Sequence, residues 1–132
     1  MPMSEGKIKV LLIEDDPDQI VLYQTKFNLE GLETVIAKNG AEGIVRAKQD
    51  KPQVILLDIV MQDMDGIEVL KRLKQDSATK DIPVLLFTNL TTKELVEKGK
   101  ELGAAAYMVK TEFTPRQVTE KVKQIAGDRL IS

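Results

Sequence analysis

Residues 10–17 read VLLIEDDP, an apolar run that passes directly into three acids and a proline. Ile8–Ile13 have the β-branched and leucine-rich composition of a strand. Asp16 can cap a helix whose first residue is a proline, a position at which a missing N–H costs nothing. The stretch therefore predicts a strand followed at once by a helix, with Glu14 and Asp15 at the junction.

Strand-like and helix-like segments alternate five times along the chain. The predicted strands are Ile8–Ile13, Leu32–Ala37, Val54–Asp58, Val84–Thr88 and Ala104–Val109. The first three predicted helices are Pro17–Leu29, which Gly31 ends, Ala41–Gln49 and Gly66–Gln75. The fourth starts at a capping box in Thr91–Glu94 and ends near Gly103. The fifth starts at a capping box in Thr114–Gln117 and ends at Gly127. The first, third and fourth strands are nearly all apolar, as in strands covered on both faces. This alternation predicts a parallel sheet with helices on both faces.

The composition excludes several classes of protein. A chain of 132 residues fits one domain, and 19 basic against 21 acidic residues give a net charge of −2, so no positive excess argues for nucleic-acid binding. The absence of Cys and His excludes disulfides, thiol nucleophiles, His-based triads and His-ligated zinc. The apolar runs are too short for a membrane span, and the polar start lacks a signal-peptide core, so we expect a cytoplasmic protein.

Polar side chains follow the predicted strands at the edge where functional groups gather in open parallel sheets. They are Glu14, Asp15 and Asp16 after the first strand, Asp58 at the end of the third, Thr88 and Asn89 at the end of the fourth, and Lys110 after the fifth. Two carboxylates ~4 Å apart repel by about 4 kcal/mol at an effective dielectric near 20. Lys110 alone would not offset such a cluster, whereas a divalent cation would, and ligands that are all oxygen suit Mg²⁺.

A metal held by acids beside a lysine and a threonine hydroxyl suits a phosphoryl group, because cations and donors stabilise its oxygens. Without His or Cys, the covalent acceptor would be a carboxylate. Asp58 is the candidate, because it is central on the sheet and apolar residues precede and follow it. Asp16, by contrast, fits the helix-cap interpretation better.

Several stretches together resemble the receiver domain of two-component response regulators. They are residues 10–17 (VLLIEDDP), 56–61 (LLDIVM) with 64–70 (MDGIEVL), 83–88 (PVLLFT) and 103–110 (GAAAYMVK). Their order and spacing cover Lys7–Ala126. The resemblance implies a flavodoxin-like, doubly wound α/β fold with a five-stranded parallel sheet in the order 2-1-3-4-5 and five helices. We therefore expect a receiver domain at residues 7–127, between a disordered segment at 1–6 and a tail at 128–132.

The resemblance also implies a phosphorylation site. Asp58 would accept a phosphoryl group from the phosphohistidine of a sensor histidine kinase or a histidine phosphotransfer protein. Glu14 and Asp15 match the acidic pair of the family, and with Asp58 and the backbone carbonyl of Val60 they would hold Mg²⁺.

Three further residues match the part of the family pattern that responds to phosphorylation. Lys110 would contact the phosphoryl oxygens, Thr88 would swing toward them, and Tyr107 would move inward behind Thr88. Taken alone, without the resemblance, Tyr107 fits plain packing with a wet hydroxyl better than a switch role. Because nothing but residues 127–132 follows the last helix, we expect output through contacts of the fourth helix, fifth strand and fifth helix with an unidentified protein target. The protein would be a monomer or a weak dimer.

The chain lacks two prolines that the family usually has, and two further positions near the site bear on the expected chemistry. Gln62 and Thr111 stand where the family usually has prolines, and the peptide bond before Thr111 can be cis or trans, although a cis bond there would cost ~2.5–4 kcal/mol. Asn89 replaces the small residue common after the threonine, and Val60 is apolar near the phosphorylation site. The two missing prolines leave open a receiver-like interaction module that is never phosphorylated.

Two other functions are compatible with parts of the sequence. The motif Asp63-Met64-Asp65 resembles the Asp-x-Asp motif of aspartate-nucleophile phosphatases, but it follows a loop rather than ending a strand. A flavin or nucleotide site suits the fold class, but no glycine-rich loop follows the first strand.

Overall fold

The computed structural model describes the backbone of residues 7–131 and the side chains of residues 7–127, and it contains a parallel sheet between two layers of helices. The strands lie in the order β2-β1-β3-β4-β5, which confirms the expected topology. They are β1 (Lys9–Ile13), β2 (Glu33–Ala37), β3 (Val54–Leu57), β4 (Val84–Thr88) and β5 (Ala106–Val109).

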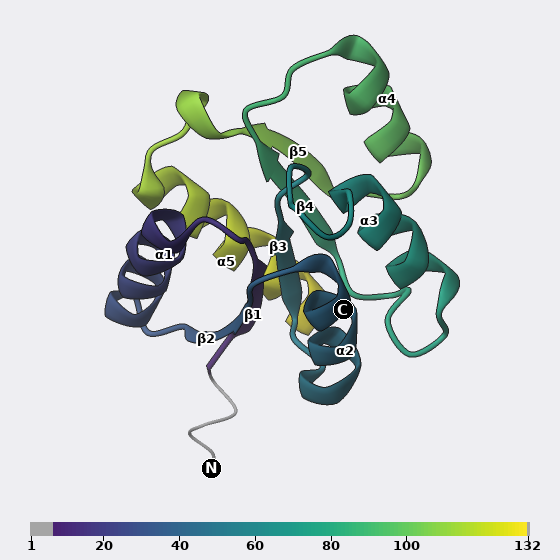
Figure 1. The fold of residues 1–132 in the computed structure, drawn as a ribbon. Helices are drawn as coiled ribbons and strands as arrows, with labels where there is room; N and C mark the ends of the chain where they lie inside the picture. The colour runs from purple at the N-terminus through teal and green to yellow at the C-terminus, as the bar shows by residue number, and fades with distance from the viewer. Residues whose placement is uncertain (1–6, 132) are drawn as a thin grey trace.

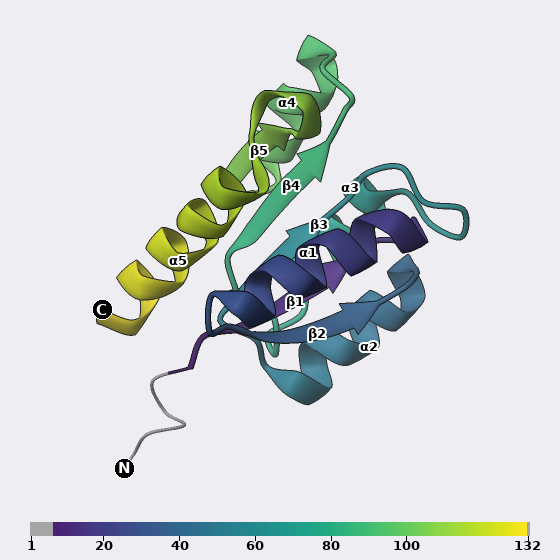
Figure 2. The same ribbon diagram turned by 90° about the vertical axis from the view of Figure 1, so that its left-hand side faces the viewer.

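Five α-helices connect and flank these strands, as predicted. They are α1 (Pro17–Leu29), α2 (Gly40–Asp50), α3 (Gly66–Gln75), α4 (Lys93–Glu101) and α5 (Pro115–Ile131), and a short 3₁₀ helix, η2 (Lys110–Glu112), precedes α5. Helices α1 and α5 cover one face of the sheet, and α2, α3 and α4 cover the other (Figures 1 and 2).

The sheet separates two apolar cores because successive side chains of a strand point to opposite faces. In β1, Leu11 and Ile13 pack on the side of α2 and α3, whereas Val10 and Leu12 pack on the side of α1 and α5. Strand β3 is fully buried along its length. Both faces therefore need apolar residues, which is why these strands are continuous hydrophobic runs.

The predicted start of the fifth strand, at Ala104, is two residues early. Helix α4 ends in a turn in which Gly103 adopts a φ of 94°. The Gly103 and Ala104 amides donate to Lys100 O and Gly99 O at 3.0 and 2.9 Å, so Ala104 completes the end of the helix. Strand β5 begins only at Ala106.

One of the two predicted capping boxes is confirmed. Thr114 Oγ1 accepts from Gln117 N at 3.1 Å, and Gln117 Oε1 accepts from Thr114 N at 2.8 Å. The box predicted at Thr91–Glu94 is wrong, because the N-cap of α4 is Thr92, one residue later than predicted. Its hydroxyl accepts from Leu95 N at 3.4 Å.

The helix end predicted at Gly127 is wrong, because α5 continues to Ile131. A glycine ends a helix readily where it adopts a left-handed conformation. Among the described residues, the glycines with positive φ are Gly31 and Gly103, which follow α1 and α4. Gly127 is not one of them, and the backbone of residues 128–131 is helical. The disorder predicted for residues 1–6 lies outside the described residues.

Within residues 7–131, none of the helices combines the length and the apolar character that a membrane crossing requires.

Gly66 brings the start of α3 against the backbone that follows β3. Its amide donates to Ile59 O at 2.8 Å. A Cβ at this position would lie 2.6 Å from Ile59 Cα and closer still to the carbonyl oxygen of Asp58. Only glycine allows this approach, so Gly66 helps to set the backbone at Asp58.

We predict that Gly66→Ala lowers the free energy of unfolding by about 1–3 kcal/mol, because the backbone of Asp58 and Ile59 must move away from the new methyl group. Gly127→Ala is the matched control. It adds the same methyl group inside α5, where nothing lies within 4 Å, and should raise stability by about 0.5–1 kcal/mol. Denaturant unfolding measures both values, and equal stability of Gly66→Ala and the wild type would contradict the close approach.

Candidate functional site at the carboxyl edge of the sheet

The sheet itself places Glu14 and Asp58 side by side. Each follows directly on a strand, and its amide continues the strand pairing. Glu14 N donates to Ala37 O at 3.0 Å, and Asp58 N donates to Ile13 O at 3.1 Å. Both side chains are buried, with only 2% of Glu14 and 7% of Asp58 exposed. The backbone thus brings two carboxylates into one poorly solvated location.

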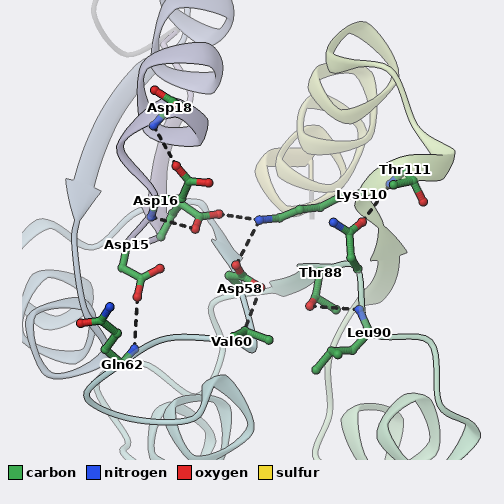
Figure 3. Close-up of polar contacts among 12 residues, drawn as sticks. Asp15, Asp16, Asp18, Asp58, Val60, Gln62, Thr88, Leu90, Lys110 and Thr111 are labelled. Atoms are coloured by element: carbon green, nitrogen blue, oxygen red, sulfur yellow. Dashed lines mark hydrogen bonds and ion pairs between the residues drawn. The ribbon is translucent and has the colours of Figure 1, made fainter.

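Lys110 bridges these two carboxylates. Its Nζ lies 2.8 Å from Glu14 Oε1 and 3.0 Å from Asp58 Oδ2. Figure 3 shows Lys110 reaching from the end of β5 toward Asp58. The ammonium also lies 5.6 Å from the centre of the Phe87 ring, which adds a cation–π contact. Three residues from distant parts of the sequence thus meet as predicted.

The electrostatics of this group follow from burial and charge together. Burial raises the pKa of the Glu14 carboxyl, and the charge of Asp58 raises it further, although Lys110 acts in the opposite direction. Burial alone would lower the pKa of Lys110, but the hydrogen bonds and charges of Glu14 and Asp58 outweigh it and raise that pKa above its usual value. Lys110 is therefore a cation at neutral pH.

The other two acids after β1 have different partners. Asp16 caps α1, as predicted, since its Oδ1 accepts from Asp18 N at 2.9 Å. Asp15 is turned toward the loop after β3, where its Oδ2 accepts from Gln62 N at 3.1 Å (Figure 3). Across the described residues, no three acidic side chains converge closely enough to form a metal-binding cluster. Asp15 is the predicted ligand that the structure does not bring to Glu14 and Asp58.

Thr88 and Tyr107 both contact Leu90 in the loop between β4 and α4. The buried Thr88 hydroxyl accepts from Leu90 N at 3.3 Å, and Tyr107 OH donates to Leu90 O at 2.7 Å. The Tyr107 hydroxyl therefore has a protein partner and is not simply wet. Burial raises the pKa of Tyr107, and the negative charge of Asp58 adds to this effect.

Val60 lies at the solvent side of the site. The residue is 58% exposed, and its amide donates to Asp58 Oδ1 at 3.3 Å. Two cavities flank the group. One of about 580 Å³ lies beside Asp15 and Gln62, and one of about 360 Å³ lies beside Lys110. Asp15 and Lys110 thus each line an open cavity, whereas Glu14 and Asp58 stay buried between them.

Comparison with known proteins identifies the arrangement. Residues 10–123 match the family described as the response regulator receiver domain. The chain belongs to this family. Receiver domains are signalling domains of two-component systems rather than enzymes in the usual sense.

Two relatives differ in how much of their own length this chain matches. The chain is 33% identical to the polar-differentiation response regulator DivK of Brucella anthropi over 119 residues, which cover 90% of this chain and 96% of DivK. It is 35% identical over 117 residues to the alkaline phosphatase synthesis transcriptional regulatory protein PhoP of Bacillus subtilis. The match covers 89% of this chain but spans only 48% of the length of PhoP.

Solved structures of receiver domains have the same fold. The chemotaxis protein CheY4 of Vibrio cholerae superposes with a TM-score of 0.84 at 28% identity, covering 91% of this chain and 99% of that one. The Mn²⁺-bound form of the response regulator Rcp1 has a TM-score of 0.75 at 27% identity, covering 89% of this chain and 91% of that one.

The positions at which this receiver domain departs from the family pattern form contacts of their own. No cis peptide bond occurs within residues 7–131, so the Lys110–Thr111 bond is trans, and Lys110 still reaches Glu14 and Asp58. Asn89 Oδ1 accepts from Thr111 N at 3.2 Å. We did not predict this contact, that of Asp15 with Gln62 N, or that of Lys110 with Phe87, because none leaves a local sequence pattern.

The Asp63-Met64-Asp65 motif has a structural role in this receiver domain. The Asp63 carboxylate accepts from Gly40 N at 2.9 Å and from Ala41 N at 3.0 Å, and so it caps α2 from a neighbouring loop. Asp65 caps α3 by accepting from Ile67 N at 2.7 Å. These contacts account for both acids without a phosphatase site.

We predict that Asp63→Ala lowers the free energy of unfolding by about 1 kcal/mol at neutral pH, because two helix amides lose their acceptor. The Gly40 and Ala41 amides lower the pKa of Asp63 below its ordinary 3.8. The stabilisation is therefore complete above that value and is lost as the pH falls through the lower folded pKa.

Denaturant unfolding of the wild type and Asp63→Ala at neutral and acidic pH measures this effect, and the gap between them should narrow in acid. Glu97→Ala, at an exposed position on α4, is the control and should stay within about 0.5 kcal/mol of the wild type. A gap that widens in acid would contradict the assigned sign.

Proposed function

We propose that this receiver domain accepts a phosphoryl group on Asp58 from the phosphohistidine of a sensor histidine kinase or a histidine phosphotransfer protein. The observation that supports this most directly is the buried Asp58 carboxylate with the Lys110 ammonium 3.0 Å from its Oδ2. A carboxylate beside a cation at the carboxyl edge of the sheet combines a nucleophile with charge compensation for the incoming oxygens.

In the proposed transfer, the phosphoryl group moves from the donor histidine to Asp58, and side chains of this chain compensate the charge. A carboxylate oxygen of Asp58 forms a bond to phosphorus while the P–N bond to the donor imidazole breaks, and the imidazole leaves with the electron pair. Lys110 compensates the charge on the phosphoryl oxygens. The Thr88 hydroxyl, which accepts a hydrogen bond from Leu90 N in this structure, would turn to donate to a phosphoryl oxygen.

Receiver domains generally bind Mg²⁺, and the acids of this edge form a donor set of the right chemistry. Glu14, Asp15, Asp58 and the carbonyl of Val60 offer only oxygen ligands, which hard divalent cations prefer. Lys110 already holds Glu14 and Asp58 together. Asp15 instead accepts from Gln62 N, so its side chain must turn toward the other two acids before it can share a cation with them. Bound Mg²⁺ would supply the positive charge that one ammonium cannot.

The signal would leave through protein contacts of α4, β5 and α5 in the cytoplasm, with the domain a monomer or a weak dimer. Phosphorylation replaces the single negative charge of the Asp58 carboxylate with a phosphoryl group that carries about −1.5 to −2 charges, a net gain of roughly half to one negative charge. Movement of Thr88 would break its hydrogen bond to Leu90, the residue that also holds Tyr107. Both contacts involve the same loop, so this loop can transmit the change to the α4–β5–α5 surface.

Asp58→Asn should abolish formation of the phosphorylated species while leaving the fold intact, because the nucleophilic oxygen is lost but the shape is kept. The experiment incubates the protein with a small-molecule phosphodonor and Mg²⁺ and measures intact mass. Asp63→Asn is the matched control and should remain labelled. Labelling of Asp58→Asn at the normal rate would refute the assignment, and no labelling of the wild type would favour the unphosphorylated interaction module.

Lys110→Ala should slow labelling by the phosphodonor roughly 10- to 100-fold, the effect of losing a hydrogen bond from a charged group. Mg²⁺ binding should weaken less or not at all, because Lys110 is not a ligand and its loss leaves the Glu14 and Asp58 carboxylates without their ammonium partner. Labelling rates and Mg²⁺ titrations measure the two effects. Lys93→Ala, at an exposed position on α4, is the control and should change neither. Weaker Mg²⁺ binding with normal labelling would contradict the role of Lys110.

A further inference from the structure

A hydrogen bond between Asn89 and Thr111 joins two loops at the edge of the site. Asn89 follows β4 directly, and its Oδ1 accepts from Thr111 N in η2 at 3.2 Å. Figure 3 shows Thr111 next to Lys110, on the side away from Asp58. We refer to this bond as the Asn89–Thr111 clamp.

The clamp holds the peptide group from which Lys110 extends. The Thr111 amide belongs to the peptide unit that directly follows Lys110, so an acceptor on that amide restrains the backbone at Lys110. At its other end, the Lys110 side chain must reach Glu14 at 2.8 Å and Asp58 at 3.0 Å. A side chain that has to meet two fixed oxygens depends on where its own backbone is held.

The β4–α4 loop is well suited to provide this restraint, because it is itself held. Leu90 N donates to Thr88, and Leu90 O accepts from Tyr107 at 2.7 Å. Asn89 lies between Thr88 and Leu90 in the sequence, and its bond to Thr111 links this loop, which Tyr107 of β5 already holds, to η2. The clamp lies in the wall of the cavity of about 360 Å³ that Lys110 also lines, so it acts at an open side of the site.

We propose that Asn89 is a positioning residue, whose carboxamide holds the Thr111 amide and thereby keeps Lys110 directed at Glu14 and Asp58. As a contribution to phosphoryl transfer, this role rests on the proposed function of Asp58. The chemistry also explains the residue pair. A proline at position 111 would have no N–H to donate, and a small apolar residue at position 89 would have no side-chain acceptor.

The first test measures the clamp without phosphorylation, by amide hydrogen exchange at Thr111. Asn89→Leu keeps the approximate shape but removes the acceptor, and it should speed exchange at Thr111 about two- to tenfold, the factor for one ordinary hydrogen bond. Asn89→Asp keeps an acceptor, and Thr91→Ala alters an exposed residue of the same loop, so both should stay near the wild type. Unchanged exchange in Asn89→Leu would overturn the proposal.

The second test separates positioning from a purely structural role. Asn89→Leu should slow labelling by a small-molecule phosphodonor by roughly the same two- to tenfold. It should have no further effect in a Lys110→Ala background, because there is no ammonium left to direct. Faster exchange with normal labelling would overturn the proposal, as would an equal loss in the Lys110→Ala background. If the wild type accepts no phosphoryl group, the proposed function fails, and the clamp is judged by the exchange measurement alone.

Discussion

The constraint on which this site depends is the burial of two carboxylates with a single ammonium. Parallel pairing of β1 with β3 leaves Glu14 and Asp58 adjacent and almost unexposed. Two unpaired charges in such a location would be costly, and their mutual repulsion adds to that cost. Lys110, which follows the edge strand β5, offsets part of this cost and ties the end of β5 to the ends of β1 and β3. Two carboxylates against one ammonium leave a formal charge of −1, which is the charge balance on which the proposed Mg²⁺ site rests.

The same constraint explains why the fold and the central residues could be predicted from the sequence. Functional groups gather beyond the carboxyl ends of the strands in an open parallel sheet, so acids that directly follow apolar strands are expected to meet there. That rule, with the resemblance to receiver domains, is enough to predict that Glu14, Asp58 and Lys110 meet. Boundaries were less predictable where one residue type serves two purposes. Gly103 ends a helix with a positive φ, whereas Gly127 lies inside one, and composition does not distinguish them.

Contacts that join a side chain to a distant backbone amide escaped prediction for a physical reason. Every non-proline residue carries an N–H, so the donor leaves no mark in the sequence. Asp63 capping α2 and Asp15 binding Gln62 N are of this kind. Asp15 was recognised as a polar residue at the site and Asp63 as an acid in a loop, but their partners depend on how loops from different strands approach one another. Such approaches follow from the packed sheet rather than from local propensity.

The two prolines that this chain lacks show how such amides shape the site. At position 62, the N–H that a proline would lack donates to Asp15, and at position 111 the N–H donates to Asn89. Each bond ties a loop to a polar side chain at the edge of the sheet. The restraint that a proline ring would give to the chain is thus replaced by a hydrogen bond, which can open and close at modest cost. In the proposed Mg²⁺ site, Asp15 would have to give up its hydrogen bond to Gln62 N, and the loop after β3 would then lose a restraint that a proline ring would have kept.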